Sequence, residues 1–467
     1  MTSATSTQTD PHDDVFMAAY LAGSAAPLPA HRATEKVRVP NDALALGGLV
    51  LTPAGPLRGW LTIEAGRITR IGSRKPTGVR TLVTDGVILP GLVDLHGHPE
   101  FNVFAAWEPP KTFVNRYSWR ASDAYGALIR EPQNKLLTSL PAGTELRYAE
   151  IRALVSGTTA IQGASGRTGG AGESLVRNVD GTIFGEHHAR TLIDLPADLT
   201  SRGGETLTSI LDGIRAGDVG AFYVHLAEGQ RSNQRSIDEF DRLVAMHALT
   251  PATVMIHGSA LSRAQLGDAA DAGAKLVWSP QSNLRLYGET TRASDALDVG
   301  LPMGLGADWL PSGSTSLLAE LKVARRVLAN QGRPITAAEL VRMVTSGAAE
   351  IAGLGDKLGS LELDRPADVL VLDRCDPDPY ESVCSSNPSD VELVFIGGDL
   401  AYGRADWVRE LADGTPEAQL EPVLAWGRPM LLDTSFQGQP DAGAAPRLAQ
   451  LRAALTSTYP PVGPIWA

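Results

Sequence analysis

The sequence predicts an α/β protein: a TIM-like (β/α)8 barrel with a smaller β-sandwich domain built from N- and C-terminal segments. Three observations support this fold class. The chain has 467 residues, of which 43% are hydrophobic, so it can bury a large core. Nearly continuous apolar runs, typical of strands covered on both faces, alternate with helical segments in the middle of the chain. Short alternating runs broken by Gly and Pro lie on both sides of that region.

Five segments follow one another along the chain. Residues 1–35 are rich in Ser, Thr, Ala and Pro and predict a flexible N-terminal tail. Residues 36–88 predict the first part of the small β domain and residues 357–404 the second part. Residues 89–356 between them predict the barrel. Residues 405–467 form a C-terminal extension, for which we expect packing on the barrel or on a second subunit of a homodimer because it contains Trp407, Trp426 and Trp466.

The expected strands are the apolar runs of these segments. The first barrel strand is the run from Val87 to His96, and the later ones are expected at 158–162, 182–184, 221–225, 253–257, 276–278 and 303–306. Strands of the small domain are expected at 49–51, 60–63, 67–71, 360–363, 367–372 and 391–396.

Composition excludes several classes of partner and compartment. The net charge of -12, without a cluster of Lys and Arg, argues against nucleic acid or an anionic membrane as a partner. The two cysteines, Cys375 and Cys384, cannot form a disulfide framework. The apolar stretch at 15–30 follows acidic residues, which is the wrong charge for a signal peptide. We therefore expect a cytoplasmic protein without a membrane span.

Four histidines and one aspartate fall at the same end of the predicted strands. His96 and His98 end the first barrel strand, His225 and His257 end two later ones, and Asp308 follows the last. Active sites of α/β barrels form at the carboxyl ends of the strands. Catalytic zinc is held by three or four protein ligands and keeps a position open for water. The sequence therefore predicts a metal centre at this end of the barrel.

The motifs around these residues resemble those of the amidohydrolase superfamily over roughly residues 45 to 402. The run from Gly91 to His98 resembles the first-strand H-x-H motif, the run from His225 to Glu228 resembles the fifth-strand H-x-x-E motif, and the run from Gly304 to Asp308 resembles the eighth-strand ligand. Residues 365–372 resemble the segment that returns to the small domain. The resemblance is to the mononuclear-metal members, in the branch of chlorohydrolases, deaminases and imidazolonepropionases.

This resemblance implies one divalent metal ion. Binuclear members usually bridge their metals with a carboxylated lysine, and no lysine lies between Lys135 and Lys275. The implied ligands are His96, His98, His225 and Asp308. Zinc is the first choice, and Fe²⁺ or Mn²⁺ fit the same ligands.

The resemblance also implies the catalytic roles. The metal lowers the pKa of its bound water to near 7, which makes hydroxide the nucleophile. Glu228 is implied as the proton shuttle, and His257 as a donor to the developing oxyanion or the hydroxide. Asp308 is expected to double as a base.

The substrate is less constrained. Trp278 stands where many deaminases of this type carry a histidine, and an indole cannot act as an acid or base, which argues against deamination of a nucleobase or an s-triazine. A long aromatic segment after His98 is expected to cover the barrel mouth. The candidate substrate-binding residues are Gln162, Trp278, Asn283, Trp309, Trp107 and Arg116.

The leading hypothesis is a metal-dependent hydrolase that cleaves a non-peptide C–N bond of a small molecule, in a cyclic amide, amidine or related group. The first alternative is an aminohydrolase that deaminates an N-heterocycle. Another is tailoring of a modified peptide, as in bottromycin-type biosynthesis. A metal-free scaffold protein is disfavoured, because every implied ligand and Glu228 are present.

Overall fold

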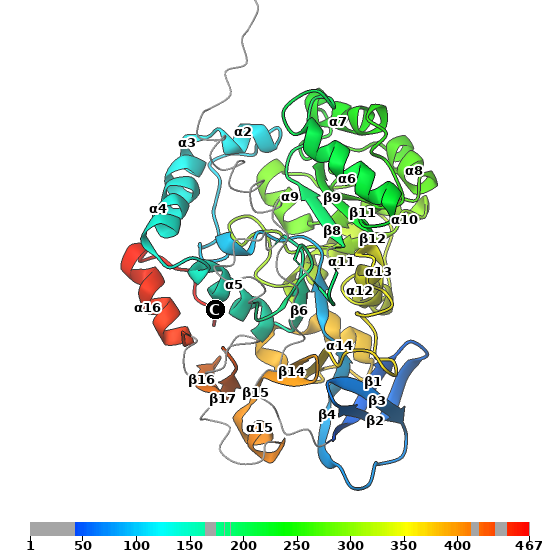
Figure 1. Cartoon of the computed structure of the whole chain (residues 1–467), viewed down its shortest axis with the longest axis vertical. Helices are drawn as coiled ribbons and strands as arrows, with labels where there is room; N and C mark the ends of the chain where they lie inside the picture. Colours follow the sequence, from blue (N-terminus) through cyan, green and yellow to red (C-terminus); the bar gives the residue numbers. More distant parts are fainter. Residues whose placement is uncertain are drawn as a thin grey trace, which may run out of the picture.

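The computed structural model describes residues 43–163, 174–181, 183–186, 188–411, 420–434 and 446–466. The expected tail at 1–35 and the apolar stretch at 15–30 lie outside these residues. Within them, the chain forms a larger α/β part with parallel strands and a smaller, mainly antiparallel β domain (Figure 1).

Eight short strands of the larger part form two parallel sheets, β5-β6-β7 and β8-β9-β10-β11-β12. Their spatial order follows the sequence, as expected when each strand is linked to the next by a crossover. The strands are β5 (Leu92–Asp94), β6 (Thr158–Ile161), β7 (Arg177–Asn178), β8 (Ala189–Leu192), β9 (Ala221–Leu226), β10 (Thr253–His257), β11 (Lys275–Trp278) and β12 (Met303–Leu305).

The two sheets meet where β12 lies beside β5. The backbone N–H of Leu95 donates to the carbonyl of Leu305 over 3.3 Å, and the N–H of Asp308 donates to the carbonyl of His96 over 2.9 Å. Gly97 and Asp308 form a parallel bridge. The first and last strands of the α/β part are therefore neighbours, whereas no ladder joins β7 to β8 among the described residues.

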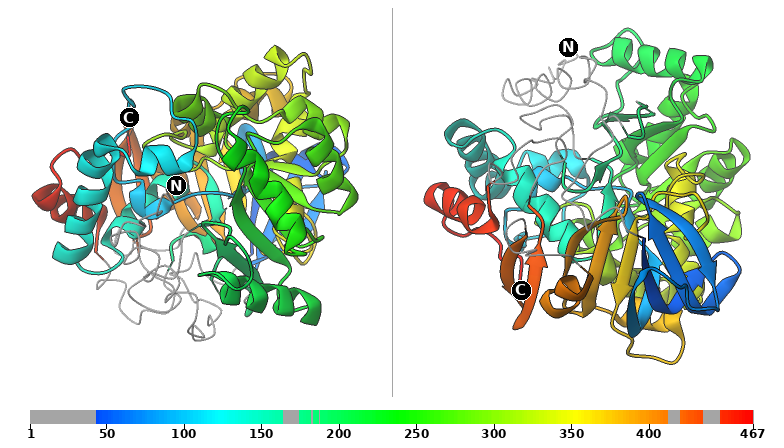
Figure 2. Two further views of the ribbon diagram at one scale, coloured as in Figure 1. Left: turned by 90° about the horizontal axis from the view of Figure 1, so that it is seen from above. Right: turned by 60° about the horizontal axis from the view of Figure 1, so that its bottom comes forward.

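Helices connect these strands and cover their outer face (Figure 2). On β9, Phe222 and Val224 belong to the buried cluster that includes the helices, while Tyr223 belongs to an interior cluster with Val254 and Val277. His225 follows Tyr223 by two residues, so it shares the interior face. The helices on that face are α5 (Thr144–Val155), α6 (Gly204–Ala216), α7 (Gln234–Ala245), α8 (Arg263–Asp271), α9 (Pro280–Tyr287), α10 (Ala293–Asp298), α11 (Leu317–Asn330) and α12 (Ala337–Arg342). The next helix, α13 (Ser346–Ile351), instead contributes Ala348, Ala349 and Ile351 to the interior cluster.

The segment that connects β5 to α5 is long and contains several short helices. Asn115 caps the first α-helix of this segment by accepting the N–H of Ser118, and Ser118 bonds back to the N–H of Asn115. Asn115 also bridges Gly229, so the segment is tied to the loop that follows β9. Its helices are η1 (Pro99–Phe101), α2 (Arg116–Arg120), α3 (Asp123–Tyr125), η2 (Gly126–Arg130) and α4 (Glu131–Ser139).

The small domain is one nine-stranded sheet in the order β16-β17-β15-β14-β13-β4-β1-β2-β3. All its ladders are antiparallel except that between β1 and β4. The tight turn between β2 and β3 places Ala65 and Gly66 at positive φ, as a two-residue hairpin requires. The strands are β1 (Leu44–Thr52), β2 (Gly55–Glu64), β3 (Arg67–Gly72), β4 (Arg80–Pro90), β13 (Val369–Leu372), β14 (Val391–Ile396), β15 (Asp399–Arg404), β16 (Glu421–Ala425) and β17 (Arg428–Leu432).

This sheet differs from the predicted sandwich, since the strands from both ends of the chain are hydrogen-bonded into one sheet. Ile68 near one edge and Leu431 near the other share a buried cluster with Leu61 and Phe395. The sheet thus curls around its own core. Figure 2 shows the N-terminal strands in blue beside the C-terminal strands in orange.

The C-terminal extension packs on the small sheet and on α5 of the same chain. Strands β16 and β17 lengthen the small sheet, and α15 (Ala405–Leu411) and α16 (Leu448–Thr458) flank it and α5. The rings of Trp426 and Trp466 lie 5.2 Å apart and pack against the large core, and Trp407 packs against the core of the small domain. The remaining described helices, α14 (Pro379–Ser385) and η3 (Pro388–Asp390), link β13 to β14.

Two expected strands are wrong. Of residues 182–184, Thr182 lies outside the described residues, Ile183 makes only an isolated bridge with Glu186, and Phe184 has a positive φ typical of a turn. The third strand is the polar pair β7, which has no apolar run to reveal it. Residues 360–363 also form no strand, because Leu361 is buried while Leu363 is 58% exposed and no neighbouring strand pairs with them.

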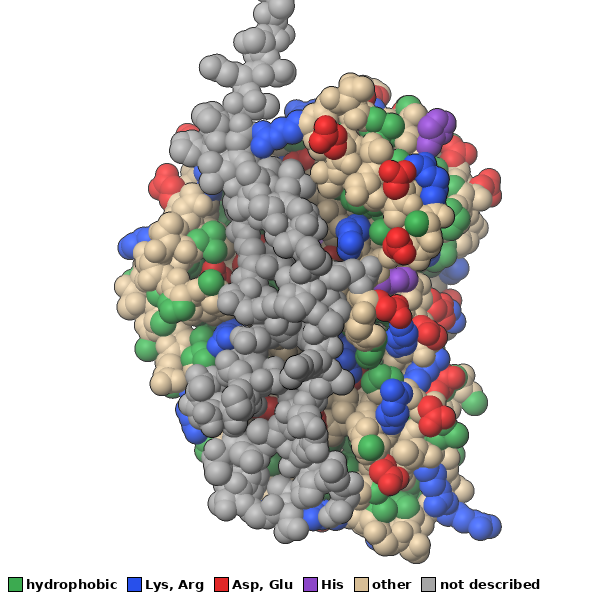
Figure 3. All heavy atoms as spheres, viewed as in Figure 1, with side chains coloured by type: hydrophobic (Ala, Val, Ile, Leu, Met, Phe, Trp, Pro, Cys, Tyr) green, Lys and Arg blue, Asp and Glu red, His purple; other side chains and the backbone are tan. Residues whose placement is uncertain are grey.

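Figure 3 can be compared with the expectation that Lys and Arg do not cluster. On the face shown in Figure 3, the visible cationic and anionic side chains are interspersed. No helix in the described part of the chain combines the length and apolar character needed to cross a bilayer.

Candidate metal centre

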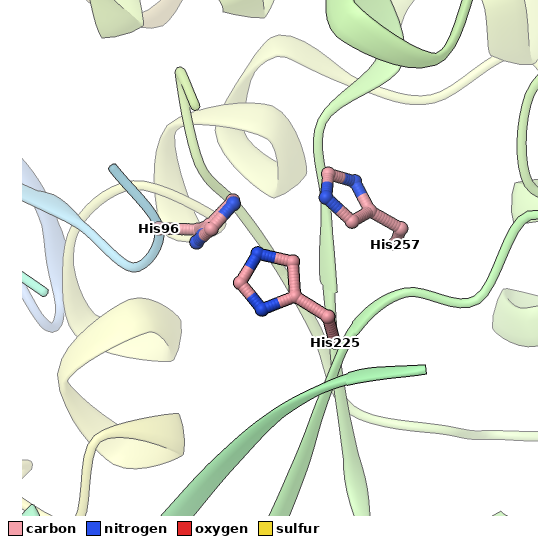
Figure 4. A group of neighbouring side chains, drawn as sticks. All are labelled: His96, His225 and His257. Atoms are coloured by element: carbon pink, nitrogen blue, oxygen red, sulfur yellow. The ribbon is translucent and has the colours of Figure 1, made fainter. Parts of the chain in front are cut away.

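The five predicted strand-end residues converge at one place. The ring centroid of His96 lies 4.9 Å from that of His98, 4.8 Å from that of His225 and 5.1 Å from that of His257. Asp308 Oδ1 lies 3.2 Å from His96 Nε2 and 3.8 Å from His98 Nε2. Figure 4 shows the rings of His96, His225 and His257 pointing toward one another. The structure therefore brings together the residues that the sequence singled out.

The backbone at this end of the strands is bent to aim these side chains. His257 has φ 69° and Asp308 has φ 60°, a left-handed conformation that is costly for residues with a side chain. Gly306 lies against His96, and a Cβ built on Gly306 would stand 2.5 Å from His96 Cβ. Only a glycine permits this close approach.

The residues fit a divalent metal. Donor atoms within 4.8 Å of one another occur in two overlapping groups, His96 with His225 and His257, and His96 with His98 and Asp308. Both ring nitrogens of His96 and Nδ1 of His225 are buried without a hydrogen-bond partner. Unpaired buried polar atoms are rare because they are costly, and ligation would satisfy them. Imidazole with a carboxylate is a donor set that zinc accepts.

The charge states also fit ligation. Burial opposes ionisation of Asp308, but the neighbouring His96, His257 and His98 outweigh it and hold the pKa of Asp308 well below its usual range. Burial lowers the pKa of His98 to about 4 and lowers that of His225. His96 differs, because Asp308 raises its pKa despite burial. An ionised carboxylate and neutral imidazoles are the forms that bind metals.

Glu228 lies beside this cluster on the loop after β9. Its Oε2 is 3.8 Å from His257 Nε2, and its Oε1 accepts a hydrogen bond from the hydroxyl of Tyr287. Burial raises the pKa of Glu228 to about 7, opposed chiefly by the charge of Arg116. A carboxyl group with such a pKa can both accept and release a proton near neutrality.

Asn283 supports His257. Asn283 Nδ2 lies 3.0 Å from His257 Nδ1, and the hydroxyl of Thr291 donates to the His257 carbonyl over 2.6 Å. Burial lowers the pKa of His257 to about 3, so its ring is neutral. The candidate substrate-binding residue Asn283 thus contacts a site residue through its side chain.

Trp278 is placed differently from the sequence-based expectation. With Leu276 it belongs to the buried cluster that packs the strands on the helices, whereas Val277 between them belongs to the interior cluster. Its indole N–H donates to Thr290 over 2.8 Å, and its side chain has no exposed surface. Trp278 therefore turns its indole N–H toward Thr290 and not toward the interior.

The guanidinium group of Arg116 is hydrogen-bonded to neighbouring carboxylates. Nε donates to Asp194 and Nη1 donates to the buried Glu239, both over 2.9 Å, and Nη2 donates to the hydroxyl of Tyr117. Glu239 also accepts the N–H of Ala227 over 2.8 Å. Arg116 therefore ties α2 to the loop that carries Glu228, and its side chain is only 2% exposed.

The other candidate substrate-binding residues are also buried. Gln162 Nε2 donates to Asp180 and to Thr191, while its Oε1 has no partner. Trp309 packs against Phe101 and Trp119, and Trp107 packs against Phe113, each within the aromatic segment after His98. This segment has an aromatic core of its own.

Sequence reasoning missed three residues that shape the site. Tyr287 bonds Glu228, and Asp180 orients Gln162; neither lies in a recognisable motif. Asp94 lies inside the first-strand motif, so a signal was present. Its Oδ1 accepts the N–H groups of His96 over 3.2 Å and of Ala307 over 3.1 Å, which joins the end of β5 to the residues that follow β12.

Comparisons with known proteins show what the chain resembles in sequence. The model of the amidohydrolase family matches residues 206–401. A 5-methylthioadenosine/S-adenosylhomocysteine deaminase of Teredinibacter turnerae is 27% identical over 345 residues, covering 62% of this chain and 73% of that protein. A guanine deaminase of Mus musculus is 25% identical over 375 residues, covering 70% and 82%.

Solved structures share the fold. A zinc-bound adenosine deaminase from Xanthomonas campestris superposes with a TM-score of 0.58 at 17% identity, covering 80% of this chain and 95% of that one. A guanine deaminase from E. coli gives a TM-score of 0.60 at 17% identity, covering 78% and 100%. A triazine hydrolase from Arthrobacter aurescens gives 0.57 at 18% identity, covering 77% and 94%. These matches support membership of the amidohydrolase family and a hydrolase that acts on C–N bonds, and the solved structures show that the fold is shared.

Proposed function

We propose that this protein is an aminohydrolase that releases ammonia from the exocyclic amino group of a small N-heterocycle, with His96, His98, His225 and Asp308 holding one divalent metal ion, first of all zinc. The observation that carries this proposal is the convergence of those four side chains beside the buried carboxyl of Glu228. The deaminase names of the sequence relatives favour this reaction over ring opening of a cyclic amide.

When bound, a divalent metal supplies a water that is acidic enough to act as a nucleophile near neutral pH. Glu228 takes the proton that this water loses, at Oε2, and delivers it to the departing nitrogen. This role is supported by the pKa of about 7, which lets Glu228 serve first as base and then as acid. His257 Nε2 lies 3.8 Å from Glu228 Oε2, where it can donate to developing negative charge. Asp308 is an ionised carboxylate among the histidines, which suits it to hold the metal.

Ring opening of a cyclic amide or amidine remains the second candidate, because the same metal ligands and proton shuttle serve both reactions. Ammonia release separates them. We expect the purified protein with Zn²⁺ to release ammonia from at least one member of a panel of 5′-methylthioadenosine, S-adenosylhomocysteine, adenosine and guanine. Hydrolysis of cyclic amides without ammonia release would instead favour ring opening.

We propose further that β5 to β12 close into one (β/α)8 barrel. The hydrogen bonds between the ends of β5 and β12 support closure on one side. On the other side, Gln162 after β6 donates to Thr191 of β8 over 3.0 Å, which spans the seam beside β7. In the described part of the chain, the barrel domain then lies within residues 89–356, and the small domain combines 43–88, 357–404 and the strands of the C-terminal extension.

A further inference from the structure

Four buried side chains form a single hydrogen-bonded chain that ends on His257. The indole Nε1 of Trp278 lies 2.8 Å from Thr290 Oγ1, and Thr290 Oγ1 lies 3.1 Å from Asn283 Oδ1. Asn283 Nδ2 lies 3.0 Å from His257 Nδ1. None of the four is more than 4% exposed, so water does not compete for these bonds.

The direction of the chain follows from the donor at each link. An indole N–H can only donate, so the Thr290 oxygen accepts from Trp278. Thr290 then gives its own hydrogen to Asn283 Oδ1, the acceptor that lies beside it. This fixes the amide of Asn283 with its oxygen on Thr290 and its NH₂ group on His257. Because that NH₂ group only donates, His257 Nδ1 must accept.

We infer that Trp278, acting through Thr290 and Asn283, holds His257 in the tautomer that carries its hydrogen on Nε2, so that His257 is a hydrogen-bond donor and stays outside the metal-ligand set. Nε2 is the nitrogen that faces Glu228. A protonated Nε2 has no lone pair to offer a metal, and the lone pair of Nδ1 is used on Asn283. Of the two groups of potential ligands, the tautomer therefore favours the one that contains His98 and Asp308.

The inference gives Trp278 a role as a positioning residue. It rests on the proposed function, since the tautomer of His257 affects turnover only if a metal and Glu228 act beside it. Trp278 lies on the outer face of its strand, yet it sets which nitrogen of His257 carries the hydrogen at the reaction site.

The tautomer can be measured directly by NMR on protein labelled with ¹⁵N-histidine, using two-bond ¹H–¹⁵N correlations assigned with His257→Gln. We expect His257 to show a protonated Nε2 and a bare Nδ1 in metal-free protein and after addition of one equivalent of Zn²⁺. We expect His96, His98 and His225 to change on zinc addition as ligated imidazoles do. A protonated Nδ1 in wild-type protein would overturn the inference.

Two variants test the chain of bonds. Asn283→Asp replaces the NH₂ donor with a carboxylate acceptor, so His257 should move its hydrogen to Nδ1, and kcat should fall about 10- to 100-fold with KM little changed. Trp278→Phe removes the donor that orients Thr290, so both tautomers should appear. Trp407→Phe, in the small domain, is the control and should leave the His257 signals unchanged.

The outcomes separate this inference from the proposed function. If no histidine signal responds to Zn²⁺, the proposed metal site is wrong. If zinc binds and His257 shifts together with the ligands, the metal site stands and the inference fails. If Asn283→Asp does not fold, the wild-type spectrum still decides the tautomer.

Discussion

The hydroxyl of Tyr287 donates its hydrogen to Glu228 Oε1 and accepts the indole N–H of Trp119 over 2.9 Å. A phenol has one hydrogen, and Trp119 can only donate, so Glu228 Oε1 is held as an acceptor. The proton that Glu228 carries must then sit on Oε2, the oxygen nearer His257. The aromatic segment after His98 is thereby linked through Trp119 to the proposed proton shuttle.

Replacing Tyr287 with phenylalanine should slow turnover without loss of metal. The variant removes a hydrogen bond to a charged group, so we expect kcat to fall about 10- to 100-fold while KM and zinc content stay close to wild type. That bond lowers the pKa of Glu228, so its loss should move the acid limb of the kcat/KM profile to higher pH. Steady-state kinetics across pH with metal analysis checks this.

Tyr402→Phe is the matched control for that variant. Tyr402 is equally buried, but its hydroxyl has no partner and lies in the small domain. It should leave kcat and the pH profile unchanged. Equal loss of activity in both variants would mean that Tyr287 acts through the fold and not through Glu228.

Glu228→Gln and His225→Ala should separate proton transfer from metal binding. Glutamine keeps the shape of Glu228 but cannot shuttle a proton, so this variant should retain zinc and lose about 10²- to 10⁴-fold in kcat. His225→Ala removes a proposed ligand and should lose both zinc and activity. Metal analysis of gel-filtered protein, together with ammonia release, tests the pair. Normal turnover by Glu228→Gln would refute the shuttle assignment.

Gly306→Ala should weaken metal binding through His96. The added methyl group would lie 2.5 Å from His96 Cβ, so His96 must shift relative to the other proposed ligands. We expect a drop in zinc affinity of at least about 10-fold in a chelator competition assay. Gly267→Ala is the control, because a Cβ there meets nothing within 4 Å and alanine favours the helix α8. Wild-type zinc affinity in Gly306→Ala would show that the strand ends tolerate the shift.

Glu320 on α11 should make stability depend on pH. It is fully buried, and burial raises its pKa to about 8, opposed by hydrogen bonds from Ser314 and the N–H of Gln281. The folded protein therefore binds this proton more tightly than the unfolded chain, whose pKa is near 4.5. The stabilising effect of protonated Glu320 is present below pH 4.5 and declines as pH rises toward 8.

Glu320→Gln should remove that decline. A few kcal/mol of pH-dependent stability are expected from such a shift, so the Tm of wild-type protein should fall relative to that of Glu320→Gln between pH 5 and 8. Glu205→Gln, an exposed change on α6, should follow wild type. Parallel melting curves of wild type and Glu320→Gln over this range would show that Glu320 is not buried as a neutral acid.

Much of the candidate site was predictable because local sequence patterns mark its proposed ligands. His96, His98, His225 and Asp308 each stand at or just beyond the end of an apolar run, and parallel strands present such ends together. The same regularity predicted most of the parallel strands and both halves of the small sheet. It failed at 182–184 and at β7, since a two-residue polar strand has no periodicity of its own and exists only because β6 offers it hydrogen bonds.

The tertiary structure alone decided which contacts are made by the side chains around the proposed ligands. Arg116 binds Asp194 and Glu239, which lie 78 and 123 residues away, and Tyr287 reaches Glu228 across 59 residues. Trp278 faces the helices because side chains alternate between the two faces of a strand, and Trp278 shares its face with Leu276 and not with Val277. Such contacts depend on how strands, helices and loops pack, and no spacing along the chain encodes them. By itself, the sequence determined which residues could hold a metal, and packing decided which residues orient them.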